Sequence, residues 1–369
     1  MKKTAITYLL FIVCLVSFVT LRVHAGRVLA SERKIVSSDE DVHDTQKTPP
    51  VAVSDTKTED KQEEEESAPE FTDENEYLWH GVIDPVAEYS GPLPRIICWG
   101  DSLTVSLDEK SAYPDILRDL SGCEVINYGV ESESASMIAM REGGIRVNVK
   151  ATVIPSDTKL IPVFLRTEDD GHVFFLDNGD GGVNPCVING IEGQLEKLNG
   201  SYYFRRNTKG ERIAIEDGTQ LKTHGMVDAR MGDVLVIFAG TNDLPTKTSV
   251  SSLIKIINGM LEAAKCDKYI VIGLTYAGGI RDIEDVNAAL EEAYGNNFVD
   301  IRKYMLYYGL KDCGIQPTDD DREDIAKGEI PSSLRKDYVH GNKHYHRLLG
   351  QQVYRRMQYL GYLPTEEDI

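Results

Sequence analysis

Short apolar runs alternate with amphipathic stretches from about Tyr77 onward, and this alternation most constrains the fold. Four runs read "RIICWG", "CEVINYG", "DVLVIF" and "KYIVIG", and "NNFVD" begins a fifth, shorter one. Runs this continuously apolar are typical of strands buried on both faces of a parallel sheet. The stretches between them have helical spacing, as in "SSLIKIINGMLEAAKC". The sequence therefore predicts an α/β fold with a doubly wound parallel sheet.

One stretch, 145–223, breaks the alternation. It contains "IRVNVKATVI", "LIPVFLRT", "HVFFLDN", "YYFRRN" and "ERIAIED", separated by turn-forming runs such as "EDDG" and "NTKGE". Short β-branched or alternating runs between such turns predict consecutive hairpins. We expect a small all-β module, inserted into the α/β domain. Its Tyr202, Tyr203 and Phe204 could form an aromatic platform for a sugar, but at alternating strand positions they are expected in the core. Asp177 to Gly182, "DNGDGG", is expected to form a tight turn.

The N-terminal segment, 1–30, has two lysines before an apolar run from Ala5 to Leu21. The run is short for a membrane-spanning helix, which needs about 20 apolar residues. Val23-His24-Ala25 resembles a cleavage site with small residues. The segment is therefore either a secretory signal or a membrane anchor. Both alternatives predict that the rest of the chain is extracellular, on the cell surface or secreted, with membrane contact only through this segment.

Residues 31–75 form a strongly acidic stretch. From Ser31 to Asn75 there are fifteen Asp or Glu residues against five Lys or Arg, so half of the net charge of −20 lies there. Few large apolar residues accompany them, and such a segment cannot bury enough surface to fold. We expect a disordered tether, followed by a catalytic domain over 76–369. The acidity of the whole chain also argues against nucleic-acid binding, which needs clustered Lys and Arg.

Polar residues that could carry chemistry follow the ends of the predicted strands. Ser102 comes just after the first strand, Gly129 ends the second, and Asn242 follows the third. Ahead of the last helix, Asp337 stands three residues before His340. Ligands bind at the carboxyl ends of strands in an open parallel sheet, so we expect these residues to converge there.

Together these residues could perform acyl transfer. Ser102 is a weak nucleophile until a base removes its proton, and His340 can be that base. Asp337 can accept the other imidazole N–H and fix the tautomer. An oxyanion would need donors, for which the candidates are the backbone N–H groups of Ser102 and Gly129 and the side-chain amide of Asn242. A serine in this position could also be an ordinary helix N-cap.

The blocks "GDSLT", "NYG", "GTND" and "DYVH" resemble those of the SGNH hydrolases, also called GDSL esterases and lipases. They occur in the family's order and cover Arg95 to Met140 and Gly232 to Tyr362. The resemblance implies a flavodoxin-like α/β/α sandwich and metal-free ester hydrolysis. It implies Ser102 as nucleophile, Asp337 and His340 as its triad partners, and Gly129 and Asn242 in the oxyanion hole. The tether and the β module have no counterpart in it.

Other polar residues receive structural assignments. His340, His344 and His346 form an H-x3-H-x-H cluster, but no carboxylate has a clear spacing to complete a zinc site. His344 and His346 are expected at the surface or the substrate rim, and no metal or cofactor is predicted. Arg141 is expected to be solvated. Asp243 is expected to cap the helix that follows it.

The sequence thus predicts an exported serine esterase. We expect it to remove acetyl or other small acyl groups from a carbohydrate or cell-wall polymer, and this substrate rests on the predicted export and on the inserted module. One alternative is a lipid-directed esterase or lysophospholipase of the same fold, which would need an apolar groove beside Ser102. Another is a non-catalytic carbohydrate-binding or adhesion protein that uses the β module.

Overall fold

The computed structural model describes residues 79–105, 112–243, 248–264, 266–275 and 283–365. The predicted leader (1–30) and acidic tether (31–75) lie outside these residues. Within the described part, no helix combines the length and the apolar character needed to cross a bilayer.

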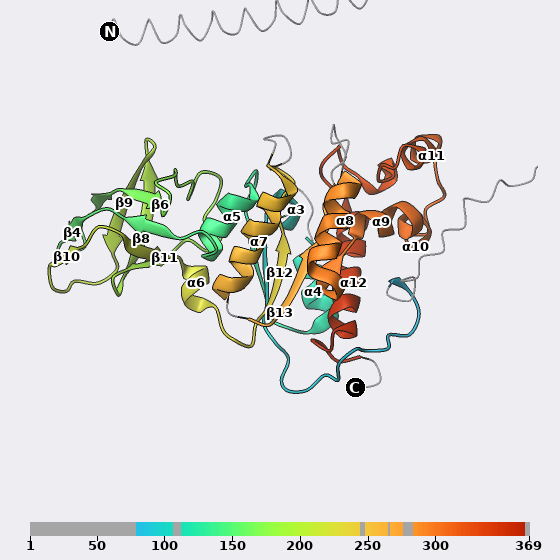
Figure 1. The fold of residues 1–369 in the computed structure, drawn as a ribbon, viewed down its shortest axis with the longest axis horizontal. Helices are drawn as coiled ribbons and strands as arrows, with labels where there is room; N and C mark the ends of the chain where they lie inside the picture. The colour runs from blue at the N-terminus through green and yellow to red at the C-terminus, as the bar shows by residue number, and fades with distance from the viewer. Residues whose placement is uncertain (1–78, 106–111, 244–247, 265, 276–282, 366–369) are drawn as a thin grey trace, which may run out of the picture. The chain divides into compact units, whose positions relative to one another are not determined.

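A parallel sheet of five strands is formed by the parts of the described chain that precede and follow the inserted module (Figure 1). Its order is β14-β13-β12-β1-β2, and every neighbouring pair is parallel. The strands are β1 (Ile96–Gly100), β2 (Val125–Gly129), β12 (Val234–Phe238), β13 (Lys268–Ile272) and β14 (Phe298–Val299). The chain runs outward from β1 to the edge strand β2, then resumes on the other side of β1 at β12. The strand order therefore reverses between β1 and β12, and the doubly wound parallel sheet predicted from the sequence is confirmed.

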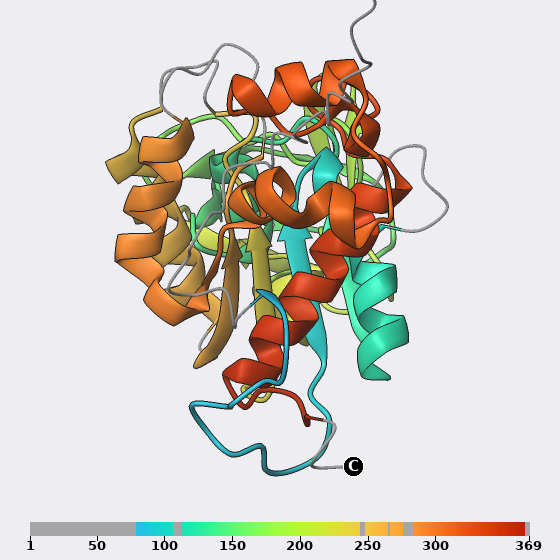
Figure 2. The ribbon, with the colours of Figure 1, turned by 90° about the vertical axis from the view of Figure 1, so that its right-hand side faces the viewer.

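Helices cover both faces of this sheet. α4 (Tyr113–Ser121) packs on α12 (Lys343–Tyr359), and α5 (Ala135–Glu142) packs on α7 (Val250–Ala264). Cys98 of β1 lies beside Tyr113 of α4, whereas the next residue, Trp99, lies under Arg141 of α5. Because successive strand residues point to opposite faces, these two helix pairs lie on opposite sides of the sheet. Figure 2 shows α12 and α4 together on one of these sides.

Burial explains why these strands read as uninterrupted apolar runs. All residues of β1 and of β12 are buried, as expected for central strands with helices on both faces. The other described α-helices are α3 (Ser102–Val105), α6 (His224–Asp228), α8 (Ile283–Tyr294), α9 (Ile301–Tyr304), α10 (Leu310–Asp312) and α11 (Asp319–Ala326).

The inserted all-β module is also confirmed. Its larger sheet is antiparallel, with the order β5-β9-β8-β7-β11-β3-β6, and β10 pairs with β4. It has its own hydrophobic core, which includes Tyr202 and Phe204. The strands are β3 (Val147–Val149), β4 (Thr152–Ile154), β5 (Ile161–Val163), β6 (Leu165–Thr167), β7 (Cys186–Ile188), β8 (Ile191–Leu198), β9 (Ser201–Arg206), β10 (Ile213–Ile215) and β11 (Thr219–Lys222).

One predicted strand of the module is wrong. "HVFFLDN", residues 172–178, forms no strand, although Val173 and Phe175 are buried as the alternating pattern indicates. The Tyr202 hydroxyl donates to the carbonyl oxygens of Val173 (2.9 Å) and Phe175 (3.0 Å). A side chain thus satisfies carbonyl groups that a neighbouring strand would otherwise pair, which lets this segment stay irregular.

Candidate active site

The residues singled out at the strand ends come together at the carboxyl edge of the sheet. His340 Nε2 lies 3.0 Å from Ser102 Oγ. His340 Nδ1 lies 2.9 Å from Asp337 Oδ2 and 3.2 Å from Asp337 Oδ1. These contacts form a continuous hydrogen-bonded chain from hydroxyl to imidazole to carboxylate, across 238 residues of sequence between Ser102 and His340.

Gly100 and Asp101 hold Ser102 in place. Asp101 caps α3, because its side chain accepts the Leu103 N–H (2.9 Å) and its carbonyl accepts the N–H groups of Thr104 (3.0 Å) and Val105 (3.1 Å). A Cβ at Gly100 would lie 2.0 Å from Thr104 Oγ1, so only glycine allows α3 to turn back this tightly over β1. Ser102 therefore starts a short helix directly at the strand end, where it is buried.

A compact turn around the Asp337 carboxylate holds His340. Asp337 Oδ1 accepts the backbone N–H groups of Val339 (2.8 Å) and His340 (2.7 Å). Burial raises the pKa of Asp337, but hydrogen bonds from the His340 backbone and ring and from Val339 outweigh it and lower this pKa to about 2. The carboxylate is therefore ionised at neutral pH and accepts a hydrogen bond from the Nδ1–H group. This tautomer leaves the Nε2 lone pair facing Ser102.

The proposed oxyanion donors differ in their surroundings. Asn242 Nδ2 donates to the Glu133 carbonyl (2.9 Å) and lies 3.4 Å from Asp101 Oδ2. The Gly129 N–H donates to Asn127 Oδ1 at 2.9 Å, so an oxyanion role for Gly129 would require this bond to break. That role remains a prediction. The Ser102 N–H stands at the first residue of α3, where helix N–H groups have no acceptor within the helix.

Gly129 has a clear steric reason to be glycine. A Cβ there would lie 2.4 Å from the Val105 nitrogen. Asn127 Nδ2 also reaches α3, donating to the Thr104 carbonyl (2.9 Å). The "NYG" block therefore packs the end of β2 directly against the short helix that begins with Ser102.

Three residues near the site differ from expectation. Arg141 is not solvated but fully buried, because Glu133 and several backbone carbonyls surround its guanidinium. His346 is buried on α12, where burial and then the nearby His340 lower its pKa to about 4. Asp243 accepts the N–H of Ala135 (2.6 Å), so it caps α5 rather than the helix that follows it.

Asp101 also lies in the interior, beside Ser102. Burial raises its pKa to about 7, against the opposing hydrogen bond from the Leu103 N–H. In the sequence, the only signal for a role of Asp101 is its place in "GDS". No cluster of three or more His, Cys, Asp or Glu side chains able to hold a metal ion occurs among the described residues.

Among known proteins, similarity was found only to solved structures. No family model matches the chain, and no curated protein matches it. A member of the lipolytic protein G-D-S-L family from Veillonella parvula aligns at 14% identity and a TM-score of 0.33, over 72% of this chain and 96% of that one. A lipase/acylhydrolase from Enterococcus faecalis aligns at 16% and 0.38, over 72% and 96%. Axe2, an acetylxylan esterase from Geobacillus stearothermophilus, aligns at 12% and 0.37, over 74% and 97%.

These TM-scores are too low to bear on activity. The molecule's own topology identifies the fold: five parallel strands in the order β14-β13-β12-β1-β2, with the four sequence blocks at one end of the sheet. The chain has the doubly wound α/β/α fold that its sequence resemblance to the SGNH hydrolases implies, with the antiparallel module as an addition.

Proposed function

We propose that this chain is a serine esterase that accepts an acyl group from its substrate on Ser102 and then transfers it to water. The observation that carries this proposal is the hydrogen-bonded chain from Ser102 Oγ through His340 to Asp337. His340 Nε2 would take the hydroxyl proton as Ser102 attacks the ester carbonyl, and would return it to the leaving alcohol. The same nitrogen would then activate water to release the acyl group.

Asp337 stabilises the imidazolium that forms in each half-reaction. With its pKa lowered to about 2, the carboxylate stays ionised and faces Nδ1 throughout. We propose the Asn242 amide as the side-chain donor to the oxyanion: one of its N–H groups is held by the Glu133 carbonyl (2.9 Å), and the other would leave Asp101 Oδ2, which lies 3.4 Å away. The Ser102 N–H is a second donor at the same strand end.

For the substrate, we propose a small acyl ester of a carbohydrate or cell-wall polymer. A groove of ≈ 540 Å³ beside the triad has Asp337, but neither Ser102 nor His340, in its described lining, which is mostly charged and includes Asp324, Lys327 and Arg335. A long acyl chain would need an apolar lining, which this groove does not offer along its described walls. The groove therefore suits the polar, non-acyl part of a carbohydrate substrate.

Tyr338 adds an aromatic surface to this groove. Its side chain is 72% exposed, and it directly follows Asp337. The Arg335 guanidinium lies 5.6 Å from the ring centroid, and Arg335 is itself held by Asp324 (2.6 Å). An exposed ring held in this way offers a flat apolar face, with a polar tip, on which a sugar ring could stack. Export through the N-terminal segment, proposed from the sequence, would bring the site to extracellular polymers.

Ester hydrolysis by the purified protein tests the proposal. We expect p-nitrophenyl acetate to be hydrolysed faster than longer-chain esters, and Ser102→Ala and His340→Ala each to lower kcat by about 10⁴-fold or more. Ser201→Ala and His172→Ala, at exposed positions of the β module, are the matched controls. Preference for long chains would support the lipid alternative. A folded protein with no turnover above Ser102→Ala would favour the binding-protein alternative.

A further inference from the structure

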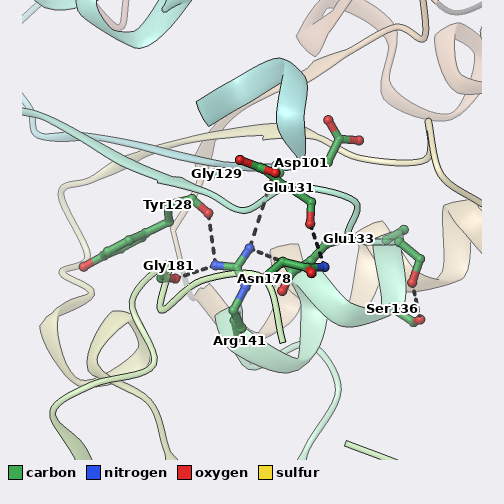
Figure 3. Close-up of polar contacts among 12 residues, drawn as sticks. Asp101, Tyr128, Gly129, Glu131, Glu133, Ser136, Arg141, Asn178 and Gly181 are labelled. Atoms are coloured by element: carbon green, nitrogen blue, oxygen red, sulfur yellow. Dashed lines mark hydrogen bonds and ion pairs between the residues drawn. The ribbon is translucent and has the colours of Figure 1, made fainter. Parts of the chain in front are cut away.

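A loop of the β module contacts the loop that follows β2. The module loop is 177–182, and the β2 loop is 130–134. Asn178 Nδ2 donates to the Glu131 carbonyl at 3.0 Å, and Arg141 Nη1 donates to the Gly181 carbonyl (Figure 3). Two points of the module loop are thus bonded to the catalytic domain beside its active edge.

Glycines allow the backbone of the module loop to approach this closely. A Cβ at Gly181 would lie 2.2 Å from Val130 Cγ2 and 2.6 Å from Arg141 Nη1. A Cβ at Gly182 would lie 2.8 Å from the Tyr128 ring. Both glycines also have positive φ, 46° and 87°, which side chains strain. The sequence of the module loop therefore suits a tight fit against the end of β2.

Arg141 ties this fit to the strand that carries the nucleophile. It is 0% exposed, and its Nη1 also donates to the Tyr128 carbonyl at 3.0 Å (Figure 3). Nε and Nη2 donate to Glu133 Oε2, at 2.8 and 2.5 Å. Nη2 further lies 3.5 Å from the carbonyl of Gly100, two residues before Ser102. A buried guanidinium needs such partners, and it fixes their relative positions in return.

The β2 loop passes this constraint on to the proposed oxyanion donor. Its Glu133 carbonyl accepts Asn242 Nδ2 at 2.9 Å, and at its end the Ala135 N–H is bound by Asp243, the residue after Asn242. The β2 loop is therefore bonded to the module through Asn178 and to Arg141 through the Glu133 side chain. Its Glu133 carbonyl in turn binds the Asn242 amide. Moving Glu131 or Glu133 would move the acceptor that orients the Asn242 amide.

We propose that the β module is a structural arm of the active site: through Arg141 and Asn178, its loop 177–182 positions the β2 loop, and so Asn242, for ester hydrolysis. Arg141 and Asn178 are positioning residues, since neither contacts a residue of the triad. This inference rests on the proposed esterase function. It assigns the module a role in the rate of reaction, in addition to any role in substrate binding.

The variant Asn178→Ala, in the full chain, tests the arm. Asn178 is exposed, so its replacement removes one hydrogen bond without opening the core. Asn207→Ala is the matched control, because Asn207 is an exposed module residue whose amide donates within the module, to Glu192 (2.8 Å). With p-nitrophenyl acetate, we expect Asn178→Ala to lower kcat about 3- to 10-fold with KM unchanged, and Asn207→Ala to change neither.

Hydrogen exchange of the peptide that contains 130–134 supplies a readout independent of turnover. We expect faster exchange there in Asn178→Ala than in Asn207→Ala, at equal melting temperature. Arg141→Lys, which keeps the charge but loses the planar fork, should lower kcat further and speed the same exchange. If this variant fails to fold, Asn178→Ala decides the question.

Two results would overturn the proposal. One is an Asn178→Ala protein that matches Asn207→Ala in both kcat and exchange. The other is a raised KM on a polymeric ester with kcat on p-nitrophenyl acetate unchanged, since this would assign the loop to substrate binding alone. If the wild-type chain shows no Ser102-dependent turnover, the esterase function fails instead, and the exchange rates alone decide whether the module positions the β2 loop.

Discussion

The active edge and the module junction each contain a cation-forming side chain bonded to a carboxylate, but in opposite environments. The His340 and Asp337 side chains are 31% and 52% exposed and 2.9 Å apart. Those of Arg141 and Glu133 are 0% and 3% exposed and 2.5 Å apart. The first pair contains an imidazole, which can take up and pass on a proton during catalysis, while the second contains a guanidinium, which binds its partners through a planar set of N–H donors.

This difference matches the work that each pair can do. A catalytic base must gain and lose a proton, so it needs access to substrate and water. A buried arginine cannot release its proton and loses stabilisation if its partners move, which suits it to holding backbone segments in place. The comparison separates chemistry at the sheet edge from positioning at the junction, and four predictions test the separation.

We expect the largest effect from a substitution that breaks the exposed pair of His340 and Asp337. Asp337→Asn replaces the acceptor for Nδ1–H with an amide that can favour the wrong tautomer, so we expect kcat to fall by about 10⁴-fold. The melting temperature should change little, because the side chain is half-exposed. The control is Asp319→Asn, whose side chain is 97% exposed in an ion pair with Arg322. Steady-state kinetics of both variants measure this, and equal kcat values would contradict the assignment.

Breaking the buried pair should instead affect stability most. Arg141→Met leaves Glu133 buried without its cation, and we expect the free energy of unfolding to fall by about 3–5 kcal/mol. The double variant Glu133→Leu/Arg141→Met should recover part of this loss. Arg205→Met, which removes an exposed pair with Glu196 (2.7 Å), should cost far less. Urea denaturation gives the three values, and similar losses for Arg141→Met and Arg205→Met would refute the distinction.

Glu142 sharpens the comparison, since it neighbours Arg141 in α5. Burial raises its pKa to about 8, against a hydrogen bond from the Gly144 N–H. The folded protein therefore keeps a proton that the unfolded chain releases above a pKa of about 4.3. The contribution of the protonated Glu142 to the free energy of unfolding is therefore fully present below the pKa of the unfolded chain, and it is lost as pH rises toward 8. We expect Glu142→Gln to flatten the decline in unfolding free energy between pH 5 and 8, whereas Glu124→Gln, at an exposed position, should leave it intact.

The smallest expected effect concerns the groove beside the exposed pair. Tyr338→Ala removes the exposed ring, and we expect KM for an acetylated polysaccharide to rise about 3- to 10-fold. The KM and kcat for p-nitrophenyl acetate should not change, because this substrate carries no sugar. Phe164→Ala is the control, since Phe164 is 71% exposed on the module. Equal KM values for Tyr338→Ala and wild type on the polymer would remove Tyr338 from the proposed substrate site.

Local sequence patterns predicted the sheet and the convergence of the triad residues. Continuous apolar runs identify buried parallel strands, and the carboxyl ends of such strands lie together. Asp337 and His340 are three residues apart, close enough for one carboxylate to bind both the ring and the backbone N–H of His340. These features depend on short spacings, so they could be recognised without knowing the tertiary structure.

The contacts of Arg141 could not be predicted in this way. Three of its acceptors are backbone carbonyls, at Gly100, Tyr128 and Gly181, and a carbonyl has no signature in the sequence. The segment 172–178 was misread for a related reason. Its apolar alternation matches that of a strand. However, the hydroxyl of Tyr202 donates hydrogen bonds to the carbonyl oxygens of Val173 and Phe175, which a neighbouring strand would otherwise pair. Long-range bonds between side chains and backbone decided both cases.

The close fit of Gly181 and Gly182 against the end of β2 limits how the module could be exchanged. The insertion lies within the connection from β2 to β12, which crosses β1 to reach the other half of the sheet. A module transplanted into a related sheet would be joined to it covalently at two ends. Its loop 177–182 would also need glycines at 181 and 182 and an asparagine at 178, and the host domain would need an arginine at 141. The module loop and the host residues that contact it therefore have to be exchanged together, although Arg141 and Gly181 are 40 residues apart in the sequence.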